Sequence, residues 1–213
     1  MMKQTIITIL LASMSICLSL SVASCQPKSS KLEGTGMAEG KELEKEIEER
    51  VTSIYETVFD WYNTHNGMSE KHQYDEEFLT QDFLLLQSKL DSISKIFNEC
   101  PSILVDFDHW TTWTTSDVYE RYQMDFSVDS VDVFCRDSAK VYMTIGKCPK
   151  NVLLKMAYTD SPQCKSTKAW FIDDFCVDGV YGPYSFSNKR CMQECIVDYQ
   201  RLSEKRSNLR THK

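Results

Sequence analysis

The stretch Ala169-Trp170-Phe171-Ile172-Asp173-Asp174-Phe175-Cys176-Val177 decides the fold of this chain. Its aromatic and β-branched residues favour a β-strand, bounded by turn-forming residues at 161–162 and 178–179. Simple alternation places Phe171, Asp173, Phe175 and Val177 on one face of this strand, and on the other face Trp170, Ile172, Asp174 and Cys176. Because both faces then carry large apolar side chains, we expect an inner strand that is covered on both sides.

Three earlier segments, 124–135, 139–145 and 152–158, also show a hydrophobic period of two residues. The period slips at Asp129-Ser130, which predicts a bulge that bends the first of these strands. Short polar links join the segments. Such links between successive strands predict an antiparallel meander of four strands that ends with the Trp170 segment.

Helical periodicity marks both ends of the predicted domain. The segment 41–63 repeats apolar residues at intervals of three and four, which predicts a helix with one buried face. A second helix is expected over 76–97 and a last one over 188–205. The predicted fold class is therefore α+β. N-terminal helices pack on a bent four-stranded antiparallel sheet, with a C-terminal helix, in a single domain over 41–213.

The first residues have the layout of a signal peptide. A cationic start at Lys3 precedes an apolar run that ends in small residues. The next four residues, Val22-Ala23-Ser24-Cys25, resemble the bacterial lipobox, in which the cysteine is acylated and becomes the mature N-terminus. This resemblance implies a lipoprotein signal peptide over 1–24 and a lipid anchor at Cys25. The alternative is ordinary cleavage, with Cys25 as a plain thiol.

The segment 25–40 is rich in Ser, Lys and Gly and predicts a flexible tether. It lacks the acidic run that follows the cysteine in surface-exported lipoproteins of some bacteria. By that resemblance we expect a lipid anchor in the bacterial cell envelope, at the outer membrane and facing the periplasm. The formal charge of the chain is -7, with no basic block before the C-terminal residues, so a nucleic-acid partner is not expected.

Three short motifs carry a further resemblance: Val58-Phe59-Asp60-Trp61-Tyr62, Asp106-Phe107-Asp108-His109-Trp110 with Asp117, and Trp170-Phe171-Ile172-Asp173-Asp174. Over about 42–177 the chain resembles a bacterial family of secreted and lipid-anchored domains of unknown function. That family has the nuclear-transport-factor-2-like, or cystatin-like, fold. The resemblance implies a cone-shaped domain and supplies no established chemistry, because this fold hosts both enzymes and binding modules.

Seven of the nine cysteines remain once Cys17 leaves with the leader and Cys25 is acylated. In an oxidising compartment they predict disulfides. In a meander, alternate turns share one end of the sheet, which brings Cys148 near Cys176 and Cys135 near Cys164. Cys148–Cys176 joins the ends of adjacent strands and is the preferred bridge. Cys135–Cys164 needs a longer reach across two strands and is the second choice. A Cys148–Cys164 bridge is excluded, because one strand of about 26 Å separates the two residues.

Few residues suggest a ligand site. Trp110 and Trp113, among nearby aspartates, could stack a sugar ring or hold a cation, although a loop pinned by its aromatic residues is the favoured interpretation. Asp174 could act as a general base in the cone, or it could be satisfied by backbone and hydroxyl donors, which we favour. Alternation points Asp173 and Asp174 to opposite faces, which argues against a paired-carboxylate site. Zinc at Cys191 and Cys195 lacks further ligands at a recognisable spacing.

These observations predict a lipid-anchored cell-envelope protein that acts as a non-catalytic binding or interaction module, with the membrane and a possible protein as partners. No catalytic residue, metal or cofactor is assigned. Two alternatives stay open: a periplasmic immunity protein whose acidic surface suits a basic toxin, and a small enzyme that uses the cone pocket. An enzyme predicts a deep pocket with one uncompensated carboxylate, whereas an interaction module predicts an exposed patch.

Overall fold

We analysed the protein as a computed structural model, which describes residues 36–64, 72–97, 107–114, 125–146, 150–179 and 182–211. The predicted signal peptide, the predicted anchor Cys25 and the bridge candidate Cys148 lie outside these residues. The residues from 33 onward form one compact unit.

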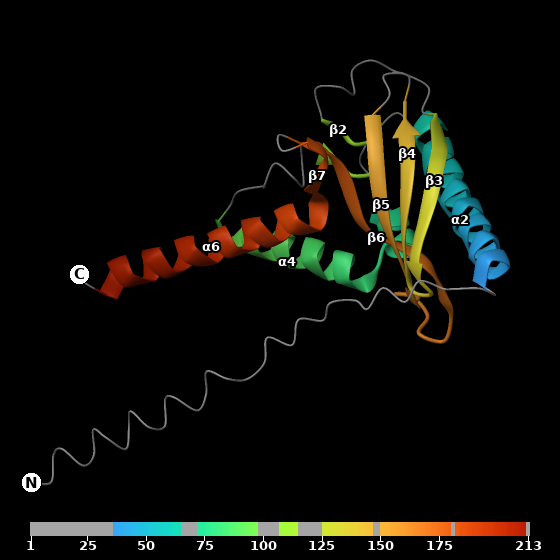
Figure 1. Cartoon of the computed structure of the whole chain (residues 1–213). Coiled ribbons are helices and arrows are strands. Elements are labelled where there is room, and N and C mark those ends of the chain that lie inside the picture. Colours follow the sequence, from blue (N-terminus) through green and yellow to red (C-terminus); the bar gives the residue numbers. More distant parts are fainter. Residues whose placement is uncertain are drawn as a thin grey trace, which may run out of the picture. The chain divides into compact units, whose positions relative to one another are not determined.

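The fold is α+β and is built on an antiparallel sheet of five strands in the order β3-β4-β5-β6-β7 (Figure 1). The strands are β3 (Phe126–Cys135), β4 (Ser138–Ile145), β5 (Lys150–Asp160), β6 (Lys168–Gly179) and β7 (Gly182–Ser187). The predicted meander and the inner position of the Trp170 strand are confirmed, since β6 pairs with both β5 and β7. The bulge predicted in the first strand is also confirmed, because the register of β3 shifts between Val128 and Ser130.

The prediction of four strands was one short. Strand β7 begins with Gly182-Pro183, a dipeptide that is typical of turns. Proline is tolerated here because β7 is an edge strand. On the open side of an edge strand no neighbouring strand needs a backbone N–H donor, so its absence from proline breaks no hydrogen bond there.

The predicted alternation along β6 was wrong beyond Ile172. Met156 pairs with Ile172 and its neighbour Lys155 pairs with Asp174, so Asp173 is the extra residue of a β-bulge. The bulge moves Phe175 and Val177 to the core face that Trp170 and Ile172 occupy, and all four belong to the hydrophobic core or pack against it. Asp174 and Cys176 therefore lie on the opposite face from Trp170.

Helix α2 (Gly36–Thr64) packs beside strand β3 (Figure 1). It begins within the segment predicted as tether, whose last residues, 36–40, are helical. Its predicted apolar stripe is confirmed, because every member is buried or packs against the core: Leu43, Ile47, Val51, Ile54, Tyr55, Val58 and Tyr62.

The single helix predicted over 76–97 is in fact two helices, α3 (His72–Phe78) and α4 (Gln81–Phe97). Leu79 and Thr80 separate them. At this break Leu79 forms a parallel bridge with Ile172, and the Thr80 amide donates to the Ile172 carbonyl at 3.0 Å. The Thr80 hydroxyl then accepts from the Phe83 amide, which makes Thr80 the N-cap of α4.

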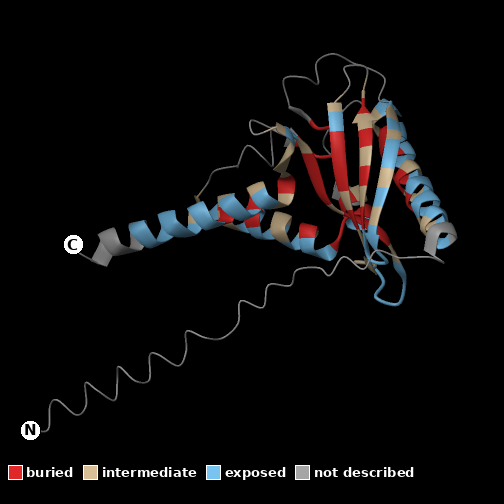
Figure 2. Ribbon diagram, in the orientation of Figure 1, coloured by how far each residue is buried: buried red, intermediate tan, exposed pale blue. Residues whose placement is uncertain are grey.

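The predicted C-terminal helix is confirmed as α6 (Asn188–Thr211), which lies alongside α4 (Figure 1). Rings from the two helices meet, with the centroids of Phe97 and Tyr199 5.0 Å apart. Near its start α6 contributes Met192 and Ile196 to the core, and further along its side chains are mostly exposed (Figure 2).

A two-stranded hairpin, β1 (Phe107–Asp108) and β2 (Trp113–Thr114), inserts Trp110 into the space between the helices and the sheet. Trp110 is fully buried against the rings of Tyr55, Phe78 and Phe175. Aromatic side chains thus fill this part of the interior. Within the described residues, no helix combines the length and the apolar character needed to cross a membrane.

Candidate functional site

The β-bulge at Asp173-Asp174 holds the starts of helices α4 and α6. Asp174 is only 2% exposed, and its carboxylate accepts from the Ser187 hydroxyl at 2.6 Å and the Lys189 amide at 3.0 Å. Ser187 in turn accepts from the Arg190 amide and so caps α6. A carboxylate at this position also complements the positive end of the helix dipole.

Two further donors reach Asp174 from its own sheet. Lys155 on β5 donates to it at 2.8 Å, and the Cys176 thiol lies 3.5 Å from the same oxygen. Burial is the largest single effect on the pKa of Lys155 and lowers it. The hydrogen bond from Lys155 to Asp174 and the negative charge of Asp174 act in the opposite direction, and the net pKa of Lys155 is raised. Asp174 is therefore a compensated carboxylate. These contacts match the interpretation that we favoured for it and not that of a free general base.

Asp173 holds the other helix. It accepts from the hydroxyl of Thr80, the N-cap of α4, and from the Lys189 ammonium, each at 2.8 Å. Lys189 thus contacts both aspartates, Asp173 through its side chain and Asp174 through its amide. The prediction that the two carboxylates point apart was wrong, because the bulge turns both toward the helix starts.

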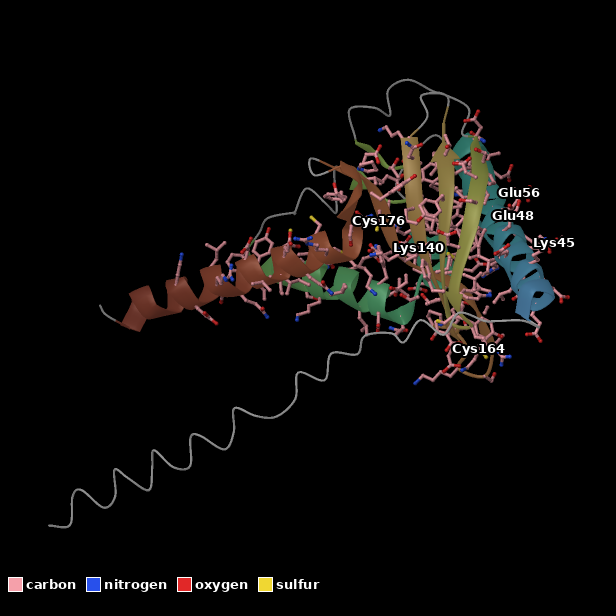
Figure 3. All side chains as sticks on the ribbon, in the orientation of Figure 1. Lys45, Glu48, Glu56, Lys140, Cys164 and Cys176 are labelled. Atoms are coloured by element: carbon pink, nitrogen blue, oxygen red, sulfur yellow. The ribbon has the colours of Figure 1, made fainter. Side chains whose placement is uncertain are left out.

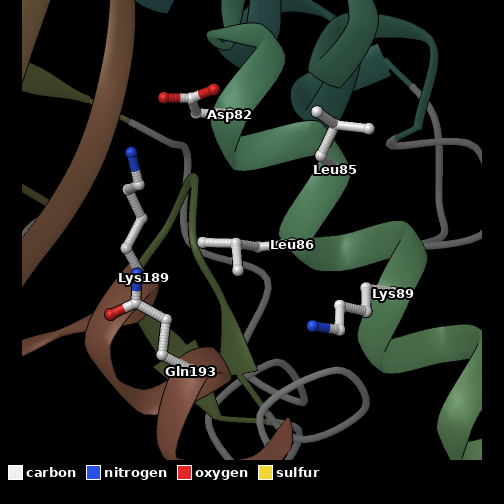
Figure 4. A pocket seen from close by; sticks show the side chains of 6 residues that line it. All are labelled: Asp82, Leu85, Leu86, Lys89, Lys189 and Gln193. Carbon is white, nitrogen blue, oxygen red and sulfur yellow. The ribbon is translucent and has the colours of Figure 1, made fainter. Parts of the chain in front are cut away.

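The bulge fixes a groove between α4 and α6. A pocket of about 290 Å³ is lined by Asp82, Leu85, Leu86, Lys89, Lys189 and Gln193. Figure 4 shows Leu86 and Lys89 extending from α4 toward the α6 residues. Because Asp173 holds Lys189, one wall of this α4–α6 groove is anchored to the sheet.

Both helices that form the α4–α6 groove carry exposed apolar side chains. Figure 2 shows that much of the surface of α4 and α6 is exposed. Leu85 and Ile96 on α4 are 57% and 78% exposed, and Val197 and Leu202 on α6 are 42% and 45% exposed. A second pocket, of about 300 Å³, lies along one side of α2 and is lined only by charged and hydroxyl residues. Figure 3 labels three of them, Lys45, Glu48 and Glu56.

The interior contains a second polar network, around Asp75. This buried carboxylate accepts from the Trp110 indole at 2.9 Å and lies 2.8 Å from Nε2 of His109. The neighbouring Asp108 accepts from the Trp110 amide and from the Tyr62 hydroxyl. Burial, followed by the charge of Asp108, raises the pKa of Tyr62, so this phenol stays protonated and donates.

The residues proposed as a ligand site are placed apart. Trp110 has no exposed surface, as expected of a loop pinned by its aromatic residues. The Trp113 side chain, Asp106 and Asp117 lie outside the described residues. Asp174 belongs to the bulge, where its hydrogen bonds are with Lys155, Ser187 and Lys189.

Neither of the two predicted disulfides is present. Cys135, Cys164 and Cys176 are free thiols, which removes Cys135–Cys164 and leaves Cys148 without its expected partner (Figure 3 shows Cys164 and Cys176). The antiparallel order that placed Cys135 and Cys164 at one end of the sheet is correct. Cys135 ends β3 and Cys164 lies in the loop that follows β5, so strand β4 lies between the two residues.

The environments of the free thiols differ. Burial raises the pKa of Cys176 to about 11. The exposed Cys164 has a lowered pKa, because Ser166 and Thr167 hydrogen-bond to its sulfur.

Sequence reasoning missed the α4–α6 groove altogether. A usable signal was present in Leu85-Leu86, because only Leu86 fits the buried stripe of the helix and Leu85 adds an apolar residue on its exposed side. The α6 residues Lys189 and Gln193 carry no such signal, since only the fold brings them opposite α4.

Among the residues that the structure describes, no group of three or more His, Cys, Asp or Glu side chains could hold a metal ion. Comparisons with protein-family models, curated proteins and solved structures found no match to this chain.

Proposed function

We propose that this chain is a lipid-anchored cell-envelope protein, and a non-catalytic interaction module that binds a protein partner in the α4–α6 groove. The observation that carries this proposal is the anchored groove with exposed apolar residues on both of its helices. Exposed apolar clusters with polar neighbours are typical of interaction surfaces.

The groove suits one or two side chains of a protein segment better than a large ligand, because 290 Å³ is at the lower end of ligand pockets. Leu85 and Leu86 offer apolar contact, and the cations Lys89 and Lys189 lie beside them. Lys189 is paired with Asp173, whereas Lys89 has no ion-pair partner among the described residues. We therefore expect the partner to present a large apolar side chain next to a carboxylate.

The polar groups of the interior support a binding role over the enzyme alternative. Asp174 and Asp75 each accept from several donors, which is the arrangement of structural carboxylates. The space around Trp110 is filled by aromatic rings.

Site-specific crosslinking tests the groove. A photoreactive phenylalanine analogue replaces Leu85 in one variant and Gln193 in a second variant. Both variants are produced in bacteria that make this protein naturally. We expect both positions to yield the same crosslinked protein, and the crosslinked peptide to contain a large apolar residue beside Asp or Glu. Lys89→Glu should reduce the product several-fold, because it places a negative charge next to the carboxylate of the partner.

The matched control carries the analogue at Glu48, in the polar pocket on α2. Equal product from Glu48, product that is insensitive to Lys89→Glu, or no product from either groove position would show that this groove is not the interface.

The anchor is tested separately. We expect Cys25→Ala to abolish metabolic labelling with a fatty acid and to leave the chain with an uncleaved leader or release it in soluble form. The reason is that the thiol is the nucleophile that takes the lipid, and several acyl chains are needed for stable anchoring. Equal label in the parent chain and the variant would disprove the lipoprotein assignment.

A further inference from the structure

Two cysteines lie one turn apart on helix α6. Cys191 and Cys195 are four positions apart in the sequence, so their side chains project in the same direction, with Cβ atoms about 5–6 Å apart. Both are partly buried free thiols.

The geometry of a helix keeps this pair as thiols. A disulfide requires Cβ atoms about 3.5–4.5 Å apart, which is closer than the spacing of one helical turn allows without distortion. Both residues are free cysteines in the structure. The pair is thus a dithiol that does not readily form a disulfide within the helix.

The donor set selects the kind of ion. Tetrahedral zinc needs three or four protein ligands, and no group of that size is found among the described residues. Two facing sulfurs match a soft ion that is satisfied by two thiolates, and Cu(I) is one of the soft ions that thiolates select. Two metal–sulfur bonds of about 2.3 Å span roughly 4.6 Å, a separation that side chains one turn apart can adopt.

The surroundings shield the pair from water on one side. Cys195 packs against the hydrophobic core, next to the buried side chains of Met192 and Ile196. A partly dry site of this kind slows oxidation of a bound Cu(I) ion, because oxidants must reach the metal from one side.

We infer that Cys191 and Cys195 form a two-coordinate binding site for Cu(I). On binding, both S–H bonds break, two Cu–S bonds form, and two protons pass to the solvent. The ion stays Cu(I) throughout, so no oxidant or reductant is consumed. This site is independent of the proposed function of the α4–α6 groove.

A competition titration tests the site. The full chain, purified in detergent with its thiols reduced and kept under nitrogen, is mixed with Cu(I) held by the coloured chelator bathocuproine disulfonate. We expect one Cu(I) ion per chain to be withdrawn from the chelator, and Cys191→Ser or Cys195→Ser each to weaken this binding at least tenfold. Cys135→Ser and Cys164→Ser remove single exposed thiols and serve as matched controls that keep the affinity.

X-ray absorption of the copper-loaded parent chain gives a readout that does not depend on a variant. We expect two sulfur neighbours around copper. Three or more sulfurs, or nitrogen and oxygen neighbours, would overturn the assignment, as would unchanged affinity in the Cys191 and Cys195 variants. Cys191→Ala and Cys195→Ala repeat the test should serine disturb α6.

Discussion

Asp174→Ala is expected to lower the free energy of unfolding by about 3–5 kcal/mol, because a hydrogen bond to a charged group contributes about 1.5–3 kcal/mol and two such bonds to α6 are lost. The substitution takes the acceptor away from the Ser187 hydroxyl and the Lys189 amide, the two groups that begin α6. Lys155 contributes less, because its side chain is 45% exposed and water replaces the lost contact. The main loss is therefore the attachment of α6 to the sheet.

Urea denaturation, followed by circular dichroism, measures this effect. Asp198→Ala is the matched control, since Asp198 lies on α6 in an exposed ion pair with Arg201 and should cost less than about 1 kcal/mol. Similar losses in the two variants would mean that the β-bulge does not hold the helix.

Trp170→Ala is expected to cost about 3–5 kcal/mol, because it removes a large side chain from a filled core. Trp170 is 2% exposed, its ring contacts that of Tyr158, and its carbonyl accepts from Arg50 on α2 at 3.3 Å. For a domain of this size, such a loss lowers the melting temperature by roughly 10 °C. An unchanged melting temperature would show the strand to be peripheral.

Trp170→Phe separates packing from hydrogen bonding. The indole N–H of Trp170 is buried and has no acceptor among the described residues. Phenylalanine keeps most of the ring and removes this unsatisfied donor, so it should cost clearly less than alanine. Equal losses would mean that the fit of the full indole, and not apolar bulk, stabilises this position.

The sequence was sufficient for the first strands of the meander because apolar residues recur there at intervals of two. Strand β4 alternates buried Val141 and Met143 with partly exposed neighbours, and period two identifies it directly. In β6 the same reasoning failed at Asp173. Apolar residues occupy both faces before the two aspartates, so alternation gives no sign of which residue is the extra one.

The break between α3 and α4 could have been found from the sequence. Thr80 has an acidic residue two positions later, in the first turn of α4, which is a typical helix start. The apolar period runs through the break and hid this signal.

The α4–α6 groove could not be predicted in the same way. Its walls come from two helices that are far apart in the sequence. The contacts of Asp173 with Thr80 and Lys189 hold the starts of both helices. Local pattern contains no information on such tertiary contacts. The preferred disulfide failed for a related reason. It assumed that Cys176 ends its strand, whereas β6 runs on to Gly179 and Cys176 lies opposite Leu153.

The contacts of the bulge also determine when the domain can fold. Thr80 meets Asp173 across 93 residues, and Arg50 meets Trp170 across 120 residues. Closing such long loops costs entropy before any contact repays it, and folding slows as sequence separation grows. The N-terminal helices cannot complete their packing on a chain that lacks β6. We therefore expect the helical half to have no stable fold of its own, and folding to wait until nearly the whole chain has been synthesised.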